Sequence, residues 1–390
     1  MIVAKKVSEQ LRSASWIRRM FEEGNRLRQE RGAENVFDFT LGNPEVEPPA
    51  SVLAAARRVL DSGKPHLHAY MPNAGFSQVR ERLAERAARA TGLPFTANHM
   101  LMTVGAGGAL NVLFKALLDP GDEVIALAPY FVEYGFYVEN HGGRLVVVPT
   151  GDDFLPDIDA IARAITPRTR AIIVNSPNNP TGVVYDAGVF ERFERLLAGA
   201  DHPIVLVSDE PYKALVFEGP RPPEVAAIVG NAVVATSWSK ALAIPGERIG
   251  VIAISPRLPE AAELHAACTF TNRVLGFVNA PALWQWVVAE TSEDAIDIAG
   301  YREKRDILYE AFTRIGYRCI KPRGAFYMFP ASPLADDVAF VRMLAEEGIL
   351  VVPGTGFGCP GHVRLSLTVP RDTVVRSLPG FERAFRRATS

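Results

Sequence analysis

The middle of the chain carries short apolar runs that alternate with stretches of helical periodicity. The runs are rich in Val and Ile, and several are nearly continuous in apolar residues, which is typical of strands buried on both faces of a mainly parallel sheet. The helical stretches between them would supply the crossovers. The pattern predicts seven strands: Met100–Val104, Glu123–Ala126, Arg144–Val148, Ala171–Val174, Ile204–Val207, Val233–Thr236 and Gly250–Ile254.

The two ends of the chain follow a different pattern. Near the N-terminus the spacing of apolar residues predicts a helix over 8–31, a short strand at Val36–Phe39, and helices over 51–60 and 75–91. Toward the C-terminus, the pattern predicts helices at Tyr301–Ile315 and 337–347, and strands at Ala325–Phe329 and Val363–Thr368.

These elements predict an α/β protein with two domains. The large domain would hold the mainly parallel seven-stranded sheet with flanking helices, and a smaller α+β domain would be built from both chain ends. We expect residues 1–45 to form an N-terminal arm and part of the small domain. Residues 46–290 would form the large domain, and 291–390 the rest of the small one. The length of 390 residues also favours two domains.

Composition excludes several classes of protein. Apolar residues make up 48% of the chain, and the formal charge is −2, so neither nucleic acid nor an anionic membrane is an expected partner. No apolar run is long enough to span a membrane, and the N-terminus lacks the apolar core of a signal peptide. The cysteines, Cys268, Cys319 and Cys359, are far apart and odd in number, so a reducing compartment, the cytoplasm, is expected. His66 and His68 lack a third ligand, so we expect loop residues and no metal.

The stretch Thr236–Gly250 carries the strongest chemical signal. Lys240 follows a predicted strand and sits among small and apolar residues, so desolvation would lower its pKa and help it form a Schiff base. Ser237, Ser239 and Arg248 lie close by in sequence. Two hydroxyls and a guanidinium suit a phosphate monoester. A surface lysine beside a serine-rich turn would give the same pattern.

Three further stretches follow predicted strands. Asp209 stands at the carboxyl end of Ile204–Val207, the edge where open α/β sheets bind ligands, and could pair with a protonated pyridine nitrogen. Asn179 lies in the loop 175–182, which two prolines and a glycine make rigid. The Gly-rich turn 105–108 offers backbone N–H groups to a phosphate, but it lacks the third glycine of a dinucleotide fingerprint. Each stretch alone could equally be an ordinary turn or cap.

Together, these stretches resemble the class I/II aminotransferases, which are fold-type I enzymes that use pyridoxal 5′-phosphate (PLP). The resemblance covers nearly the whole chain in the expected order. It implies the PLP-dependent transferase-like fold and a ping-pong exchange of an amino group between an L-amino acid and a 2-oxo acid. Lys240 matches the lysine that binds PLP and moves the proton. Asp209 matches the acid at the pyridine nitrogen, while Tyr212 and Asn179 match the residues that hydrogen-bond the phenolic oxygen of the ring.

The resemblance also assigns the remaining positions. Phe131 matches the aromatic residue stacked on the ring, with Tyr130 as the competing choice. Arg364 matches the arginine that binds the substrate α-carboxylate, and Gly42 and Asn179 are expected to contact the substrate too. A phosphate cradle would be formed by Ala106, Gly107, Ser237, Ser239, Arg248 and, from the neighbouring subunit of a homodimer, Tyr70.

Two departures from the family pattern concern specificity and phosphate binding. The segment 269–281 replaces a Ser/Thr-rich stretch that often shapes the side-chain pocket; Arg273 within it either binds a second carboxylate or lies on the surface. The turn 105–107 lacks the hydroxyl residues of some relatives, so backbone donors would carry more of the phosphate binding.

Other reactions remain open on the same scaffold. PLP also supports β-lyases, decarboxylases and acyltransferases, and fold alone does not choose among them. A non-catalytic regulator would be expected to carry an added DNA-binding domain, and no basic helix-turn-helix pattern is present.

Overall fold

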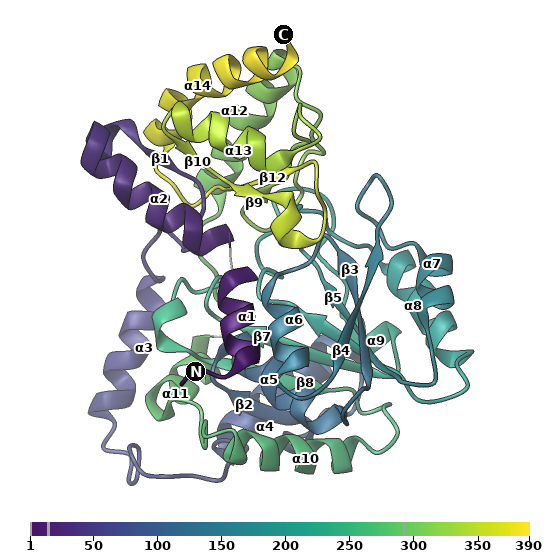
Figure 1. The fold of residues 1–390 in the computed structure, drawn as a ribbon. Coiled ribbons are helices and arrows are strands. Elements are labelled where there is room, and N and C mark those ends of the chain that lie inside the picture. The colour runs from purple at the N-terminus through teal and green to yellow at the C-terminus, as the bar shows by residue number, and fades with distance from the viewer. Residues whose placement is uncertain (1, 14–15, 292) are drawn as a thin grey trace.

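The computed structural model describes residues 2–13, 16–291 and 293–390. Within these residues the large domain is built on a seven-stranded sheet of order β2-β8-β7-β6-β5-β3-β4 (Figure 1). Only β8 runs antiparallel to its neighbours β2 and β7. The strands are β2 (Met100–Thr103), β3 (Glu123–Ala128), β4 (Arg144–Pro149), β5 (Thr169–Asn175), β6 (Val205–Asp209), β7 (Ala232–Ser237) and β8 (Gly250–Ile254).

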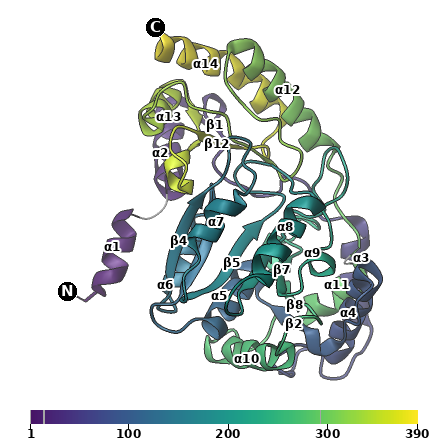
Figure 2. The ribbon, with the colours of Figure 1, turned by 90° about the vertical axis from the view of Figure 1, so that its right-hand side faces the viewer.

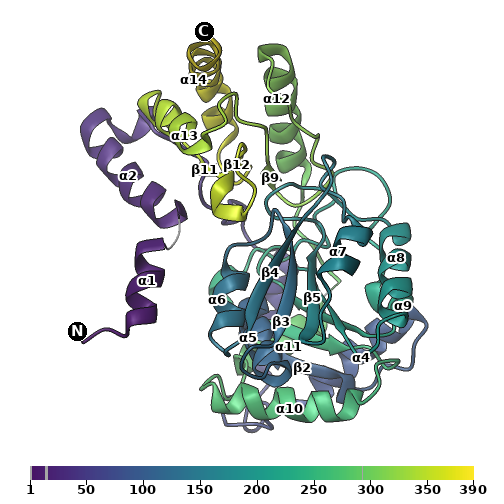
Figure 3. The ribbon, with the colours of Figure 1, turned by 45° about the vertical axis from the view of Figure 1, so that its right-hand side comes forward.

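Helices cover both faces of this sheet. One apolar layer joins α5, α6 and α10 to one face, and a second layer joins α7, α8 and α9 to the other, as Figures 2 and 3 show. The inner strands are therefore buried on both sides, which explains their continuous apolar runs. The helices are α5 (Gly105–Leu117), α6 (Glu133–Glu139), α7 (Ile158–Ala164), α8 (Ala187–Ala198), α9 (Val225–Ile228) and α10 (Ala261–Val274). Another apolar cluster joins α3 (Ala50–Asp61), α4 (Ser77–Thr91) and α11 (Ala282–Thr291) to β2 and β8.

Both chain ends contribute to the smaller unit at the top of Figure 1. Among the described residues it contains an antiparallel sheet β11-β12-β9 and a parallel pair β1-β10 that joins Phe37 to Ile349. One apolar cluster packs most of these elements together, and it also includes Tyr212, Leu215, Phe217 and Ala243 of the large domain. The elements are α2 (Trp16–Arg31), β1 (Phe37–Asp38), α12 (Ala299–Ile315), β9 (Tyr327–Met328), α13 (Asp337–Glu346), β10 (Ile349–Leu350), β11 (Val352–Pro353), β12 (Val363–Ser366) and α14 (Arg371–Thr389).

The fold class and all seven predicted strands are confirmed. The helix predicted over 8–31 corresponds to α1 (Lys5–Ser13) and α2, and residues 14 and 15 between them lie outside the described residues. The strand predicted from Ala325 is too long, because Ala325 has φ +55° and only Tyr327–Met328 pairs. The C-terminal helix α14 was not predicted, since Pro379 stands inside it.

The topology brings several polar strand ends to one edge. The parallel strands β5, β6 and β7 end at Asn175, Asp209 and Ser237. Gly250, the first residue of the antiparallel β8, pairs with Ser237 and with Thr103 at the end of β2. The start of α5 therefore lies at the same edge. Across the part of the chain that the structure describes, no helix is long and apolar enough to cross a membrane.

Candidate active site

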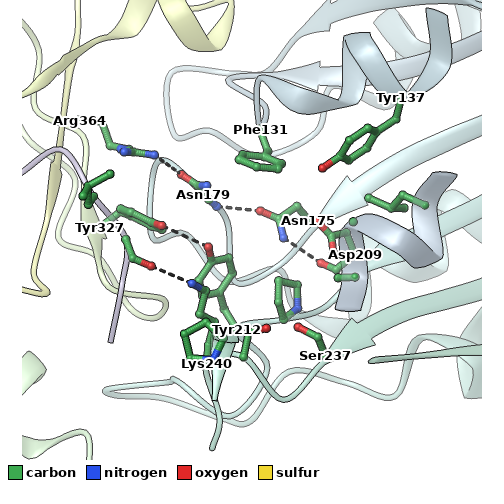
Figure 4. Close-up of a pocket in the computed structure, with 18 of the residues that line it drawn as sticks. Phe131, Tyr137, Asn175, Asn179, Asp209, Tyr212, Ser237, Lys240, Tyr327 and Arg364 are labelled. Atoms are coloured by element: carbon green, nitrogen blue, oxygen red, sulfur yellow. Dashed lines mark hydrogen bonds between the residues drawn. The ribbon is translucent and has the colours of Figure 1, made fainter. Parts of the chain in front are cut away.

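A cavity of about 310 Å³ lies at this edge of the sheet, and residues of the smaller unit also line it (Figure 4). It brings together residues that are up to 324 positions apart, from Thr40 to Arg364. With the exception of Tyr70, every site residue predicted from the sequence lines it: Gly42, Ala106, Gly107, Phe131, Asn179, Asp209, Tyr212, Ser237, Ser239, Lys240, Arg248 and Arg364.

Lys240 lies in the turn that follows β7, and its Nζ donates a 2.7 Å hydrogen bond to the carbonyl oxygen of Gly42. Burial, which is the largest cause, and the positive charges of Arg248 and Arg364 together lower the pKa of the amine to about 8. A larger fraction of the amine is therefore neutral at physiological pH than in an exposed lysine. A neutral amine is the form that attacks a carbonyl carbon.

Asp209 ends β6 and is 5% exposed. Its Oδ2 accepts a 2.6 Å hydrogen bond from the hydroxyl of Tyr134, whereas its buried Oδ1 has no partner among the described residues. The pKa of this carboxyl is raised to about 7: burial is the largest cause, the Tyr134 hydrogen bond acts against it, and the charge of Glu210 acts with it. A buried, unpartnered carboxylate oxygen on a cavity wall calls for a charged donor. The protonated nitrogen of a pyridine ring fits that requirement.

Tyr212 and Tyr327 place their hydroxyl oxygens 3.2 Å apart at the cavity wall. Burial raises the pKa of both phenols, so both remain protonated and can donate. Asn179 is held by its backbone N–H, which donates to Oδ1 of Asn175 at 2.7 Å. These neutral groups can hydrogen-bond a ring oxygen without adding charge.

Arg364 is a buried cation without a carboxylate partner in the described residues. It is 2% exposed, and its Nη1 and Nη2 donate to Oδ1 of Asn179, at 3.3 Å, and to the carbonyl oxygen of Thr40. The buried Nε has no partner there either. The guanidinium lies over the rings of Tyr327 and Phe357, at 4.7 and 4.9 Å from their centroids. A planar cation held in this way can bind a substrate carboxylate through two hydrogen bonds.

The opposite end of the cavity suits an anion. Four N–H groups in the first turn of α5 lack partners within the helix, and its dipole is positive there. Gly105 has φ +69°, and a Cβ on it would lie 2.6 Å from Nη2 of Arg248. A glycine at this position therefore lets the guanidinium approach the helix start. Two buried hydroxyls, of Ser237 and Ser239, line the cavity beside it.

The ring of Phe131 faces the cavity (Figure 4). Tyr130 is not among the residues that line it. Phe131 contacts Tyr134 edge-on, with a centroid distance of 5.6 Å. Tyr130 instead stacks on Tyr134, with a centroid distance of 6.5 Å. Of the two aromatic residues considered from the sequence, the structure places Phe131 where it could cover a flat ring.

Comparison with known proteins agrees with this chemistry. The sequence model of "Aminotransferase class I and II" matches residues 34–378. The chain belongs to the class I and II aminotransferases. It is 39% identical to the aspartate/prephenate aminotransferase of Thermus thermophilus over 372 residues, which cover 93% of this chain and 94% of that protein. It is 32% identical to the aspartate aminotransferase of Geobacillus stearothermophilus, covering 87% and 88%.

Solved structures show the same relationship. An amino transferase from Eubacterium rectale superposes with a TM-score of 0.95 at 39% identity, covering all of both chains. The Thermus thermophilus aspartate aminotransferase with maleate gives a TM-score of 0.86 at 34% identity, covering 98% of this chain and 100% of that one. The aminotransferase fold and the PLP-dependent aminotransferase function follow from these matches, and the predictions of both are confirmed.

Four residues considered in the sequence analysis do not line the cavity of this aminotransferase. Tyr70 is 91% exposed. Arg273 is exposed too, with its guanidinium 5.5 Å from the ring centroid of Phe270. Neither residue lines the cavity of its own chain. His66 and His68 belong to no cluster that could hold a metal within the described residues.

The structure adds cavity residues that the sequence analysis did not select. Tyr137 comes from α6, and Tyr327 comes from β9 of the smaller unit. Tyr134, also from α6, does not line the cavity but donates to the cavity residue Asp209. Their signal in the sequence is weak, because aromatic residues in an apolar stretch are usually core residues. Asn175 could have been found, since it ends β5 as Asp209 ends β6, and its Nδ2 donates to the Asp209 carbonyl oxygen at 2.8 Å.

Proposed function

We propose that the cavity holds PLP with Lys240 at its reactive carbon, Asp209 at its ring nitrogen and the start of α5 at its phosphate. The buried, unpartnered Oδ1 of Asp209 carries this proposal, because it requires a charged donor from the ligand. The lowered pKa of Lys240 and the position of Arg248 beside the start of α5 support this orientation of PLP. Tyr212 and Asn179 would donate to the phenolic oxygen, and Phe131 would cover the ring.

Each residue then has a defined task in transamination. Bound PLP supplies an electron sink that stabilises negative charge at the substrate α-carbon. Asp209 keeps the ring nitrogen protonated, which makes that sink effective. The Lys240 amine removes the α-proton as a general base and returns it as a general acid. Its pKa of about 8 lies close to physiological pH, where a group can perform both steps.

Arg364 would bind the α-carboxylate of the substrate. Its pairing with Thr40 and Asn179 fixes the plane of the guanidinium, and Nε remains available. Gly42 places its backbone beside Lys240 at the same end of the cavity. Amino acid and 2-oxo acid share this carboxylate, so one site would serve both half-reactions.

The amino donor and acceptor can be found by following each half-reaction alone. The holoenzyme is first mixed with a single amino acid and no 2-oxo acid, beginning with aspartate. The product form is then mixed with a 2-oxo acid, beginning with prephenate; the Thermus thermophilus relative is named after both compounds. We expect one equivalent of 2-oxo acid and of pyridoxamine phosphate per subunit, and a 2-oxo acid should reverse the change. Continuous release of pyruvate and ammonia without an acceptor would instead indicate a β-lyase.

We also propose a homodimer in which Tyr70 reaches the phosphate site of the other subunit. Asn279 fixes the backbone beside it by donating to the carbonyl oxygens of Met71 and Pro72, at 3.2 and 3.0 Å. The exposed phenol thus projects from a held loop. Lys240→Ala and Tyr70→Ala proteins, each impaired alone, should regain activity when their subunits are exchanged, because one hybrid site keeps both residues. No recovery would contradict the shared site.

The domain limits and the location remain proposals as well. We place the limits near residues 45 and 290, supported by the pairing of β1 with β10, which joins the two chain ends in the smaller unit. We place the protein in the cytoplasm, since Cys268, Cys319 and Cys359 are all unpaired. Limited proteolysis near both limits and cell fractionation would test these two points.

A further inference from the structure

Tyr137 lines the cavity beside the first turn of α5, with its hydroxyl pointing inward (Figure 4). Gly107, a residue without a side chain, lies next to it. A Cβ built on Gly107 would lie 3.0 Å from the Tyr137 hydroxyl oxygen and 3.7 Å from the ring Cζ. The hydroxyl therefore stands next to the place where a side chain at position 107 would begin.

The electrostatic surroundings make this hydroxyl a donor. Burial is the largest cause that raises the pKa of Tyr137; the charges of Glu133 and Asp209 raise it further, and only Arg248 lowers it. The phenol is therefore protonated at physiological pH. None of the hydrogen bonds found in the described residues involves its oxygen, although the group is aimed into a cavity that Arg248 also lines. The donor therefore has no acceptor among the residues that the structure describes.

We propose that the Tyr137 hydroxyl donates a hydrogen bond to the phosphate group of the cofactor, in place of the side-chain hydroxyl that the turn 105–107 lacks. The proposal rests on the proposed binding of PLP with its phosphate at the start of α5. A phosphate monoester has three terminal oxygens that each accept several bonds. Gly107 contributes its N–H and leaves the space above it open, and Tyr137, reaching across from α6, fills the edge of that space with a neutral donor.

Two ligands that differ only in the phosphate group can distinguish a contact with the phosphate from a contact with the rest of the cofactor. Cofactor-free Tyr137→Phe and wild-type proteins are titrated with pyridoxamine phosphate and with pyridoxamine, and binding is followed by ligand fluorescence. We expect the Kd for pyridoxamine phosphate to rise about tenfold, the size typical of a lost hydrogen bond to a charged group. The Kd for pyridoxamine should not change. Tyr130→Phe is the matched control, because it removes a hydroxyl from the same segment outside the cavity.

The other outcomes overturn the proposal. Equal weakening of both ligands would place the hydroxyl at the ring, and unchanged binding of both would mean that it contacts neither part. A change confined to the KM of amino acids would assign Tyr137 to the substrate. If wild-type protein itself failed to bind pyridoxamine phosphate, the proposed function would fail, which is a different result.

Returning a hydroxyl to position 107 provides a second test. In Tyr137→Phe the nearest ring atom, Cζ, is 3.7 Å from the position of a Cβ at residue 107, an ordinary contact that leaves room for serine. The double variant Gly107→Ser, Tyr137→Phe should recover part of the affinity for pyridoxamine phosphate, and none for pyridoxamine. A double variant that binds the phosphate ligand no better than Tyr137→Phe would contradict the placement of the phosphate over residue 107.

Discussion

The Tyr134 hydroxyl donates a 2.6 Å hydrogen bond to Oδ2 of Asp209 and leaves Oδ1 of the same carboxylate without a partner. The two residues come from α6 and β6, and both are nearly inaccessible to solvent. The hydrogen bond orients the carboxylate, so that Oδ2 is bonded to Tyr134 and Oδ1 faces the cavity. It also stabilises the charged form of Asp209 and so lowers its pKa, whereas burial raises that pKa.

Removing this hydrogen bond should make Asp209 harder to ionise. In Tyr134→Phe the pKa of Asp209 should rise, because a hydrogen bond to the charged form is lost. The acid limb of pyridoxamine phosphate binding should therefore shift toward higher pH, by about one unit. The measurement is Kd against pH for both proteins, whose difference cancels the titration of the ligand. Superimposable profiles would show that Tyr134 only fills space.

Asp209 should also destabilise the cofactor-free protein as the pH rises. Its pKa is about 7 when folded and 3.8 ordinarily, so the folded state binds more protons between these values, and the free energy of unfolding falls as pH increases. Asp209→Asn removes this titration. The variant should be more stable than wild type at pH 8, by an amount on the order of a few kcal/mol, and the difference should vanish near pH 4. Urea unfolding at both pH values tests this; a pH-independent difference would contradict it.

Lys240→Ala should abolish the absorbance of the lysine-bound cofactor and lower turnover by at least about 10²-fold, the usual contribution of a general base. Lys304 provides the control, since burial lowers its pKa to about 8 as well. Its Nζ instead donates to the carbonyl oxygen of Val369 at 2.8 Å and pairs with Glu45, away from the cavity. Folded Lys304→Gln should keep the absorbance. Retained activity in Lys240→Ala would remove the assigned role.

The sheet of the large domain and the site residues at its strand ends could be predicted from local sequence. Asp209 and Ser237 follow continuous apolar runs, and parallel strands must end at a common edge, so their proximity follows from the pattern. Tyr134 and Tyr137 carry no such signal. Which of their hydroxyls reaches Asp209 and which reaches Gly107 depends on how the seven-residue helix α6 packs on the sheet. Tyr327 belongs to the smaller unit, so no local sequence pattern could predict that it lines the cavity.

Arg364→Ala should raise the KM for amino acids and 2-oxo acids alike, because both present the same carboxylate. A loss of about 100-fold in kcat/KM is expected for removing one partner of a buried charge pair. Arg364→Lys should recover only part of it, since an ammonium lacks the planar fork. Arg371→Ala is the control: its ion pair with Glu303 is exposed, so its removal should leave KM unchanged. An unaltered KM in Arg364→Ala would assign the carboxylate to another cation.

Gly42→Ala should disturb the site through Tyr327. A Cβ at residue 42 would lie 1.9 Å from the Tyr327 hydroxyl oxygen and 2.8 Å from its Cζ, so the ring has to move. That movement would break the 3.2 Å contact with Tyr212 and shift the carbonyl oxygen that accepts from Lys240. We expect a loss of stability of about 1–3 kcal/mol, typical of overpacking, together with a slower first half-reaction.

The matched control for this clash is Gly300→Ala. Gly300 lies in α12, and a Cβ there would meet nothing within 4 Å, so alanine should be neutral or slightly stabilising in the helix. Thermal unfolding and stopped-flow absorbance with one amino acid measure both effects. If Gly42→Ala unfolded at the wild-type temperature and reacted at the wild-type rate, the close packing of residue 42 against Tyr327 would not be what orients the Lys240 amine.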